Sequence, residues 1–209
     1  MAVHYGKTRQ KGRIVRYMDP INIFVGINFL LTFGANLGGA QKGLKSTVSA
    51  PKEKPRTYLQ KLPMYLSVIT LLVLIFAIFQ LGTLGYKDTY KSLRLAGLIV
   101  YFVFSWIQIW ASRKLGSNYS TDILISKNHQ LITKGPFKII RHPQYLSQFL
   151  MDLGAGVATL SYILVPLAFI ELPFLIMRAT LEDRLLAKHF NTSFENYKKK
   201  TGFMIPFIG

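Results

Sequence analysis

The sequence predicts an all-α, polytopic integral membrane protein with about five transmembrane helices, and three observations support this fold class. Half of the 209 residues are apolar, and they gather in long segments that are almost free of charge. The formal net charge is +17, and the basic residues lie mostly between those segments. Apolar segments separated by basic loops are typical of helices that cross a bilayer. A nucleic-acid-binding protein would have the charge without this segregation, so that class is disfavoured.

Five apolar segments account for the predicted helices. The first is interrupted by asparagines and glycines and is the least apolar, whereas the third ends in Trp106 and Trp110, which suit a membrane interface. The last two are short and are separated by about one residue, Ser161, which predicts a tight helical hairpin. Pro166 and Pro173 predict kinks in its second helix. In chain order, the segments are residues 20–40, 62–84, 93–110, 145–160 and 162–177.

The chain divides into two regions at about residue 110. Residues 1–110 contain a basic tail and three predicted helices. Residues 111–209 contain a long polar loop, the hairpin and a charged C-terminal segment. That last segment has apolar residues at helical spacing, namely Leu181, Leu185, Leu186 and Phe190.

The basic residues also predict an orientation. Six lie in the first loop, six in the third loop and six in the C-terminal segment, against five in the N-terminal tail and three around the second loop. Because basic loops stay in the cytosol, we expect the third loop and the C-terminal segment to face the cytosol together. No apolar stretch with a cleavage site closely follows the basic tail, so no cleaved signal peptide is expected.

Several kinds of site are disfavoured by the sequence. The chain has no cysteine, which excludes disulfides and thiolate chemistry. Its four histidines are scattered without zinc-binding spacing, so no metal is expected. Neither a glycine-rich dinucleotide loop nor a Walker loop is present, and a nucleotide-like cofactor would need a different architecture.

Two polar clusters flank the predicted hairpin, and each alone has a simple structural interpretation. The first could anchor a helix at the lipid headgroups, with Pro143 in its first turn. The second contains Arg178 and Glu182, which share a helix face and could form a weak ion pair. Asp152 and Glu171 lie inside apolar segments, where ionisable groups are costly, and they could serve function or link helices. The clusters read His129-x-Leu131-Ile132-x-x-Gly135-x-Phe137 followed by Arg141-His142-Pro143-Gln144-Tyr145, and Arg178-x-x-x-Glu182-Asp183.

Together, the clusters resemble the isoprenylcysteine carboxyl methyltransferase family and the related phospholipid methyltransferases. The family pattern is approximately His-x-Leu-Val-x-x-Gly-x-Tyr-x-x-x-Arg-His-Pro-x-Tyr, a membrane hairpin, Arg-x-x-x-Glu-Glu and an aromatic tail. The resemblance covers about residues 116–206, and the tail is seen as Phe190, Phe194, Tyr197 and Thr201. This chain departs from the pattern where Phe137 replaces Tyr, Asp183 replaces the second Glu and Phe194 replaces the first Tyr of the tail.

The resemblance implies S-adenosylmethionine as the cofactor and a lipid or lipid-modified acceptor. Arg178 and Glu182 would be the catalytic residues, with Arg178 facing the acceptor and Glu182 also contacting the cofactor. A carboxylate such as Glu182 can pair with the cofactor ammonium, His142 can bond its carboxylate, and aromatic faces suit its cationic sulfonium. The implied cofactor-binding residues are His129, Leu131, Ile132, Phe137, His142, Pro143, Gln144, Tyr145 and Glu182.

Two other functions remain open from the sequence alone. Sterol-reductase-like enzymes are similar in the C-terminal region and use NADPH, but they usually have more membrane spans. A non-catalytic protein that binds anionic lipid would explain the charge and leave the clustered motif unexplained. The acceptor also stays open between isoprenylcysteine, phosphatidylethanolamine and a small thiol.

Overall fold

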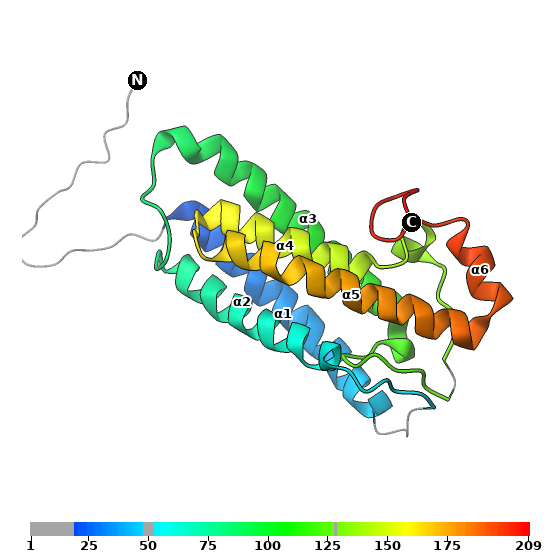
Figure 1. The fold of residues 1–209 in the computed structure, drawn as a ribbon. Helices are drawn as coiled ribbons and strands as arrows, with labels where there is room; N and C mark the ends of the chain where they lie inside the picture. Colours follow the sequence, from blue (N-terminus) through cyan, green and yellow to red (C-terminus); the bar gives the residue numbers. More distant parts are fainter. Residues whose placement is uncertain (1–18, 48–51, 128) are drawn as a thin grey trace, which may run out of the picture.

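A computed structural model describes residues 19–47, 52–127 and 129–209 as an elongated bundle of helices (Figure 1). These residues form no named β-strand, and the predicted all-α class is confirmed. Long helices run along the bundle and a short one packs at its end: α1 (Pro20–Thr47), α2 (Leu62–Ile78), α3 (Lys91–Leu115), α4 (Pro143–Thr159), α5 (Leu164–Phe190) and α6 (Thr192–Lys198). Short 3₁₀ turns lie between them: η1 (Tyr58–Gln60), η2 (Asp88–Tyr90), η3 (Gly116–Asn118) and η4 (Gly135–Lys138).

The helix α5 differs most from its predicted counterpart. The sequence predicted an apolar helix that ends at residue 177, followed by a separate helical segment. The structure has one helix that continues through Pro173 to Phe190. Arg178 and Glu182 therefore lie on the same helix as the apolar segment that precedes them.

Three helical stretches of the described chain are long and apolar enough to cross a membrane: Tyr58–Ile78, Asp88–Asn118 and Leu164–Phe190. The start of α1 adds a shorter apolar stretch, Pro20–Ala35. Large apolar side chains on the outer faces of these helices are exposed in the isolated chain, as at Leu72, Ile99 and Phe169. Apolar surface of this extent suits contact with lipid.

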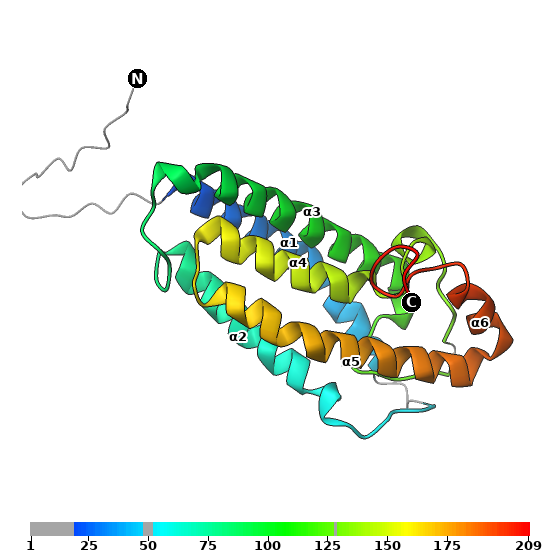
Figure 2. The same cartoon turned by 45° about the horizontal axis from the view of Figure 1, so that its top comes forward.

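Helices α3 and α4 pack at backbone contact. A Cβ atom on Gly97 would lie 2.7 Å from the backbone nitrogen of Ala158, and one on Gly154 would lie 2.6 Å from that of Tyr101. Small residues at such crossings let membrane helices approach closely. Figure 2 shows the two helices side by side, so the second half of α4 is held by a rigid neighbour.

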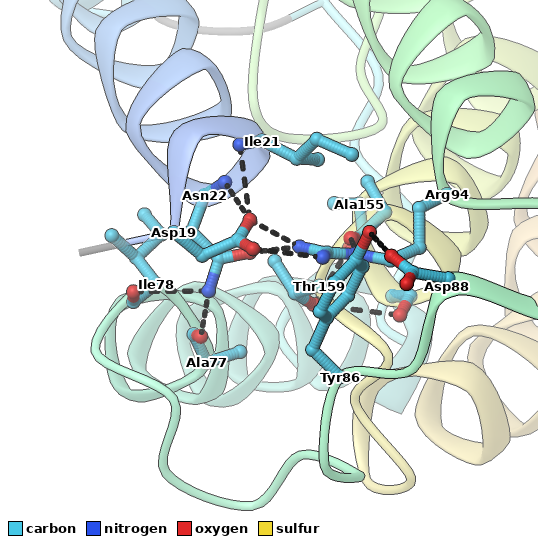
Figure 3. A network of polar contacts seen from close by, with 12 residues as sticks. Asp19, Ile21, Asn22, Ala77, Ile78, Tyr86, Asp88, Arg94, Ala155 and Thr159 are labelled. Atoms are coloured by element: carbon cyan, nitrogen blue, oxygen red, sulfur yellow. Dashed lines mark hydrogen bonds and ion pairs between the residues drawn. The ribbon is translucent and has the colours of Figure 1, made fainter. Parts of the chain in front are cut away.

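A buried ion pair joins the helices at this same end of the bundle, where α4 finishes (Figure 3). Arg94 is 2% exposed and donates from both Nη atoms to Asp19, at 2.9 and 2.5 Å, and from Nε to a carbonyl of α4 at 2.8 Å. Asn22 accepts a further bond from Arg94 and donates to the last carbonyls of α2. Burial alone would raise the pKa of Asp19, but the hydrogen bond and charge of Arg94 outweigh it and hold that pKa below its ordinary value. Arg94, counted by sequence with the second loop, is therefore a buried structural charge of α3.

Candidate functional site

A cavity opens at the other end of the bundle, where α5 continues past the start of α4. Its empty volume is about 890 Å³, which includes the part open to solvent. The walls come from the loop between α3 and α4, the first turn of α4, the second half of α5 and α6, which surround this end of the bundle in Figure 1.

The structure brings all the predicted cofactor-binding residues together on this cavity. Arg178, predicted to face the acceptor, is not among the lining residues. That these residues bind a cofactor stays a prediction. The predicted residues on the wall are His129, Leu131, Ile132, Phe137, His142, Pro143, Gln144, Tyr145 and Glu182.

Asp183 is the anchor of the Arg-His-Pro motif, a role that the sequence did not reveal. Its Oδ2 accepts from Arg141 Nε at 3.0 Å, and its Oδ1 lies 2.8 Å from His142 Nε2. Both partner side chains are buried, at 3% and 4% exposure. With Nε2 engaged, His142 presents Nδ1 to Glu182 Oε2 at 3.8 Å. Asp183 thus fixes the orientation of the His142 ring through Nε2. The Nδ1 atom of His142 remains available to a ligand in the cavity.

Tyr145 connects Glu182 to Arg178. Its hydroxyl donates to Glu182 Oε1 and accepts from Arg178 Nε at 2.9 Å. The remaining Arg178 nitrogens donate to the carbonyl of Leu59, at 3.2 Å, and to that of Thr121. The predicted Arg178–Glu182 pair is present at 3.8 Å, but the guanidinium mainly clamps η1 and the long loop onto α5.

The N-terminal half of the chain supports the wall of the cavity through η1. Gln60 makes two hydrogen bonds with the backbone of Ile123: its Nε2 donates at 2.9 Å and its Oε1 accepts at 2.8 Å. Leu59 packs with Ile123, Ile125 and Leu185 in a buried apolar cluster under the same loop. The η1 turn, from the part of the chain where the sequence shows no motif, therefore positions the lining residues of the long loop.

His129 lines the cavity and has one buried ring nitrogen without a partner in the described part of the chain. Its ring lies 6.0 Å from that of Phe190, and its buried Nδ1 has no hydrogen-bond partner among the described residues. Burial, with a smaller contribution from the charge of His189, lowers the pKa of His129. The imidazole is therefore neutral at pH 7 and can serve as a donor or acceptor to a ligand.

A stripe of polar residues leads from the cavity into the bundle along α4. Gln144, Gln148 and Asp152 follow one another at intervals of four residues and so share a helix face. Gln148 donates to Asp152 Oδ2 at 2.6 Å, and Asp152 contacts Glu171 of α5. Ser67 of α2 donates to Glu171 at 3.0 Å. The two carboxyl groups found inside apolar segments therefore belong to one interhelical polar network.

Other lining residues come from positions that the sequence did not single out as ligands. Tyr197 fixes the wall because its hydroxyl donates to the carbonyl of Phe137 at 2.6 Å. Phe194 is 1% exposed and packs beneath that wall. Both belong to the aromatic tail of the pattern, whereas Asn118 and Asp122 lie in a stretch of the loop without any signal.

Comparisons with known proteins agree with the predicted resemblance. Residues 96–188 match the model of the isoprenylcysteine carboxyl methyltransferase (ICMT) family. A protein-S-isoprenylcysteine O-methyltransferase of Schizosaccharomyces pombe is 30% identical over 135 residues, which cover 64% of this chain and 52% of that protein. The cobalt-zinc-cadmium resistance protein CzcN of Cupriavidus metallidurans is 37% identical over 83 residues, 38% of this chain and 37% of the relative.

A solved structure shares the fold. The structure of the eukaryotic intramembrane Ras methyltransferase ICMT superposes with a TM-score of 0.58 at 21% identity, and covers 90% of this chain and 68% of that chain. In sequence, this chain spans about half the length of the S. pombe relative. The predicted resemblance is confirmed: residues 96–188 resemble the ICMT family, and the chain shares the fold of an ICMT.

Proposed function

We propose that this chain is an S-adenosylmethionine-dependent methyltransferase that forms a methyl ester on the carboxylate of an isoprenylcysteine-type acceptor. One observation carries the proposal. The Arg-His-Pro-x-Tyr motif and the acidic pair of α5, far apart in sequence, form one cavity at an end of the bundle. The name of the S. pombe relative supports the choice of acceptor.

The chemistry of the cavity fits this cofactor. When bound, S-adenosylmethionine supplies an electrophilic methyl group on a cationic sulfonium. Glu182 keeps Oε2 facing the cavity and can hold the cofactor ammonium, while His142 Nδ1 and His129 Nδ1 are free to bond polar groups. Phe137 offers an aromatic face to the adenine or the sulfonium.

Methyl transfer to a carboxylate demands positioning more than proton transfer. The acceptor is already nucleophilic at neutral pH, so no residue has to act as a general base. Glu182 therefore does not have to accept a proton and can bind the cofactor ammonium. Arg178 stands next to it and can exchange a backbone carbonyl for the acceptor carboxylate, a stronger partner for a guanidinium.

The acceptor would reach the site from the membrane. We infer that α1 to α5 cross the bilayer, with the cavity on the cytosolic side. The excess of Lys and Arg in the first loop, the third loop and the C-terminal segment supports this orientation. A prenyl chain would then reach the site from the lipid, and the polar cofactor would reach it from the cytosol.

A single assay tests the activity and the acceptor. Full-length protein in nanodiscs receives methyl-tritiated S-adenosylmethionine with N-acetyl-S-farnesylcysteine, with its S-propyl analogue or with phosphatidylethanolamine. We expect base-labile label, released as volatile methanol, with the farnesyl compound and little with the other two. Base-stable label on the phospholipid would replace the carboxylate with an amine acceptor. Absence of label on every acceptor, together with stabilisation by NADPH and not by S-adenosylhomocysteine, would reject methyl transfer.

A further inference from the structure

The C-terminal hook, residues 202–209, is joined by backbone bonds to the Arg-His-Pro motif. The nitrogen of Gly202 donates to Ile139 O at 3.1 Å, and Arg141 N donates to Gly202 O at 2.8 Å. His142 N donates to Phe203 O at 3.1 Å. A Cβ atom on Gly202 would lie 1.9 Å from a carbonyl oxygen of the hook, so the turn needs glycine. The base of the hook is therefore fixed to the segment that leads into α4.

The tip of the hook is apolar and strongly exposed. Phe207 is 94% exposed, Ile208 is 62% exposed and Ile205 is 55% exposed. Ile139, which precedes the motif and is bonded to the hook, is 54% exposed. Phe207 also has a φ of 64°, a conformation that a bulky residue seldom adopts. In water this cluster would present large apolar groups without any contact that compensates for them.

The hook lies at the level where α4 would enter a membrane. Its base pairs with residues 139–142, directly before α4 begins at Pro143. Figures 1 and 2 both show it, in red, beside the ends of α3 and α4. Trp110, on the last turns of α3, is 47% exposed, and a tryptophan near the end of an apolar helix is typical of the interface.

Basic residues flank the hook and Ile139 in the sequence. Lys138 precedes Ile139, and Lys198, Lys199 and Lys200 lead into the hook, all with exposed side chains. An apolar tip flanked in sequence by basic residues matches the boundary between acyl chains and acidic headgroups, because an anionic surface attracts basic side chains.

We propose that the tip of the hook, residues 205–208 with Ile139, is a membrane anchor that inserts into the acidic interface of the bilayer that holds the helices. The anchor bears on the cavity because Phe203 packs edge-on against His142, with ring centroids 5.0 Å apart. Insertion of the hook depends only on the chain being a membrane protein, whereas its effect on the cavity rests on the proposed cofactor, so either can fail without the other.

Single cysteines test the anchor cleanly because the chain has no native cysteine. Phe207→Cys and Ile205→Cys, each labelled with an environment-sensitive dye, are placed in nanodiscs that contain acidic phospholipid. Ser193→Cys on α6, also exposed, is the matched control. We expect lipid-borne nitroxide to quench the hook labels and aqueous iodide to quench the control. Quenching of both hook labels by iodide alone would overturn the proposal.

Two further measurements test the lipid chemistry and the link to the cavity. Replacing acidic lipid by phosphatidylcholine should weaken nitroxide quenching at position 207, and unchanged quenching would reject the role of the lysines. The Ile205→Ser/Phe207→Ser variant should bind S-adenosylhomocysteine several-fold more weakly than the wild type in nanodiscs and equally in detergent. Equal affinity in nanodiscs would reject any effect of the anchor on the cavity.

Discussion

Replacement of Asp183 by alanine should damage both stability and cofactor binding. The change removes one carboxylate and leaves two buried donors, Arg141 Nε and His142 Nε2, without their acceptor. Breaking a buried ion pair by removing one partner costs about 3–5 kcal/mol. Asp183 is 13% exposed and Arg141 keeps a bond to the carbonyl of Thr201 at 2.7 Å, so we expect the lower end, about 3 kcal/mol.

The matched control for this prediction is Asp183→Glu, which keeps the charge and restores the residue of the family pattern. Chemical unfolding in detergent should give a stability close to wild type for Asp183→Glu and clearly lower for Asp183→Ala. Calorimetric titration with S-adenosylhomocysteine should follow the same order, because His142 loses its fixed orientation only in the alanine variant. If Asp183→Ala unfolds and binds ligand like the wild type, Asp183 is not the anchor of the motif.

Three other predictions concern the packing of α3 on α4, the buried Arg94–Asp19 pair and the hydrogen bonds of Arg178. Gly154→Ala should destabilise the protein in a thermal melt, because its Cβ would meet a backbone nitrogen of α3 at 2.6 Å, whereas Gly34→Ala, with open space around it, should not. Arg94→Met should cost about 3–5 kcal/mol in unfolding at pH 7. Because Arg94 lowers the pKa of Asp19, that stability is present above the ordinary pKa, about 4, and is lost as pH falls through the folded-state value, so the two proteins should converge in acid. Arg178→Lys should lower turnover more than ligand affinity, because an ammonium lacks the planar fork that bonds Tyr145 and two carbonyls; equal loss of both would contradict this.

Hydropathy predicted where the helices lie better than where they end. The apolar segments predicted at residues 62–84 and 93–110 correspond to α2 and α3, shifted by a few residues at their ends. The error in α5 has a physical cause. Hydropathy drops after residue 177 because the helix becomes polar, while the helical spacing of Leu181 and Leu185 continues without a break. A polar extension was thus mistaken for a separate element.

Side-chain roles were predictable where the motif is local and not where partners are distant. His129 and Tyr145 were placed on one ligand site by pattern, and the structure brings them to one cavity. Two partners of Arg178 are backbone carbonyls, one in η1 and one in the long loop, and no composition or spacing encodes them. The one in η1 is more than a hundred residues away in sequence. The pairing of Arg94 with Asp19 was hidden for the same reason.

The two ends of α4 explain how the bundle and the site share one structure. Backbone contact at Gly97 and Gly154 fixes α4 against α3, and Arg94 locks its far end to α1. The first turn of α4 is also tied to α3, because Gln144 Nε2 donates to Ser112 Oγ at 2.9 Å, so the motif sits on a fixed helix. The opposite wall consists of loop residues that depend on hydrogen bonds from Gln60 and Arg178. Because those few bonds are weaker than the helix packing, we expect ligand access to move the loop wall while α4 stays in place.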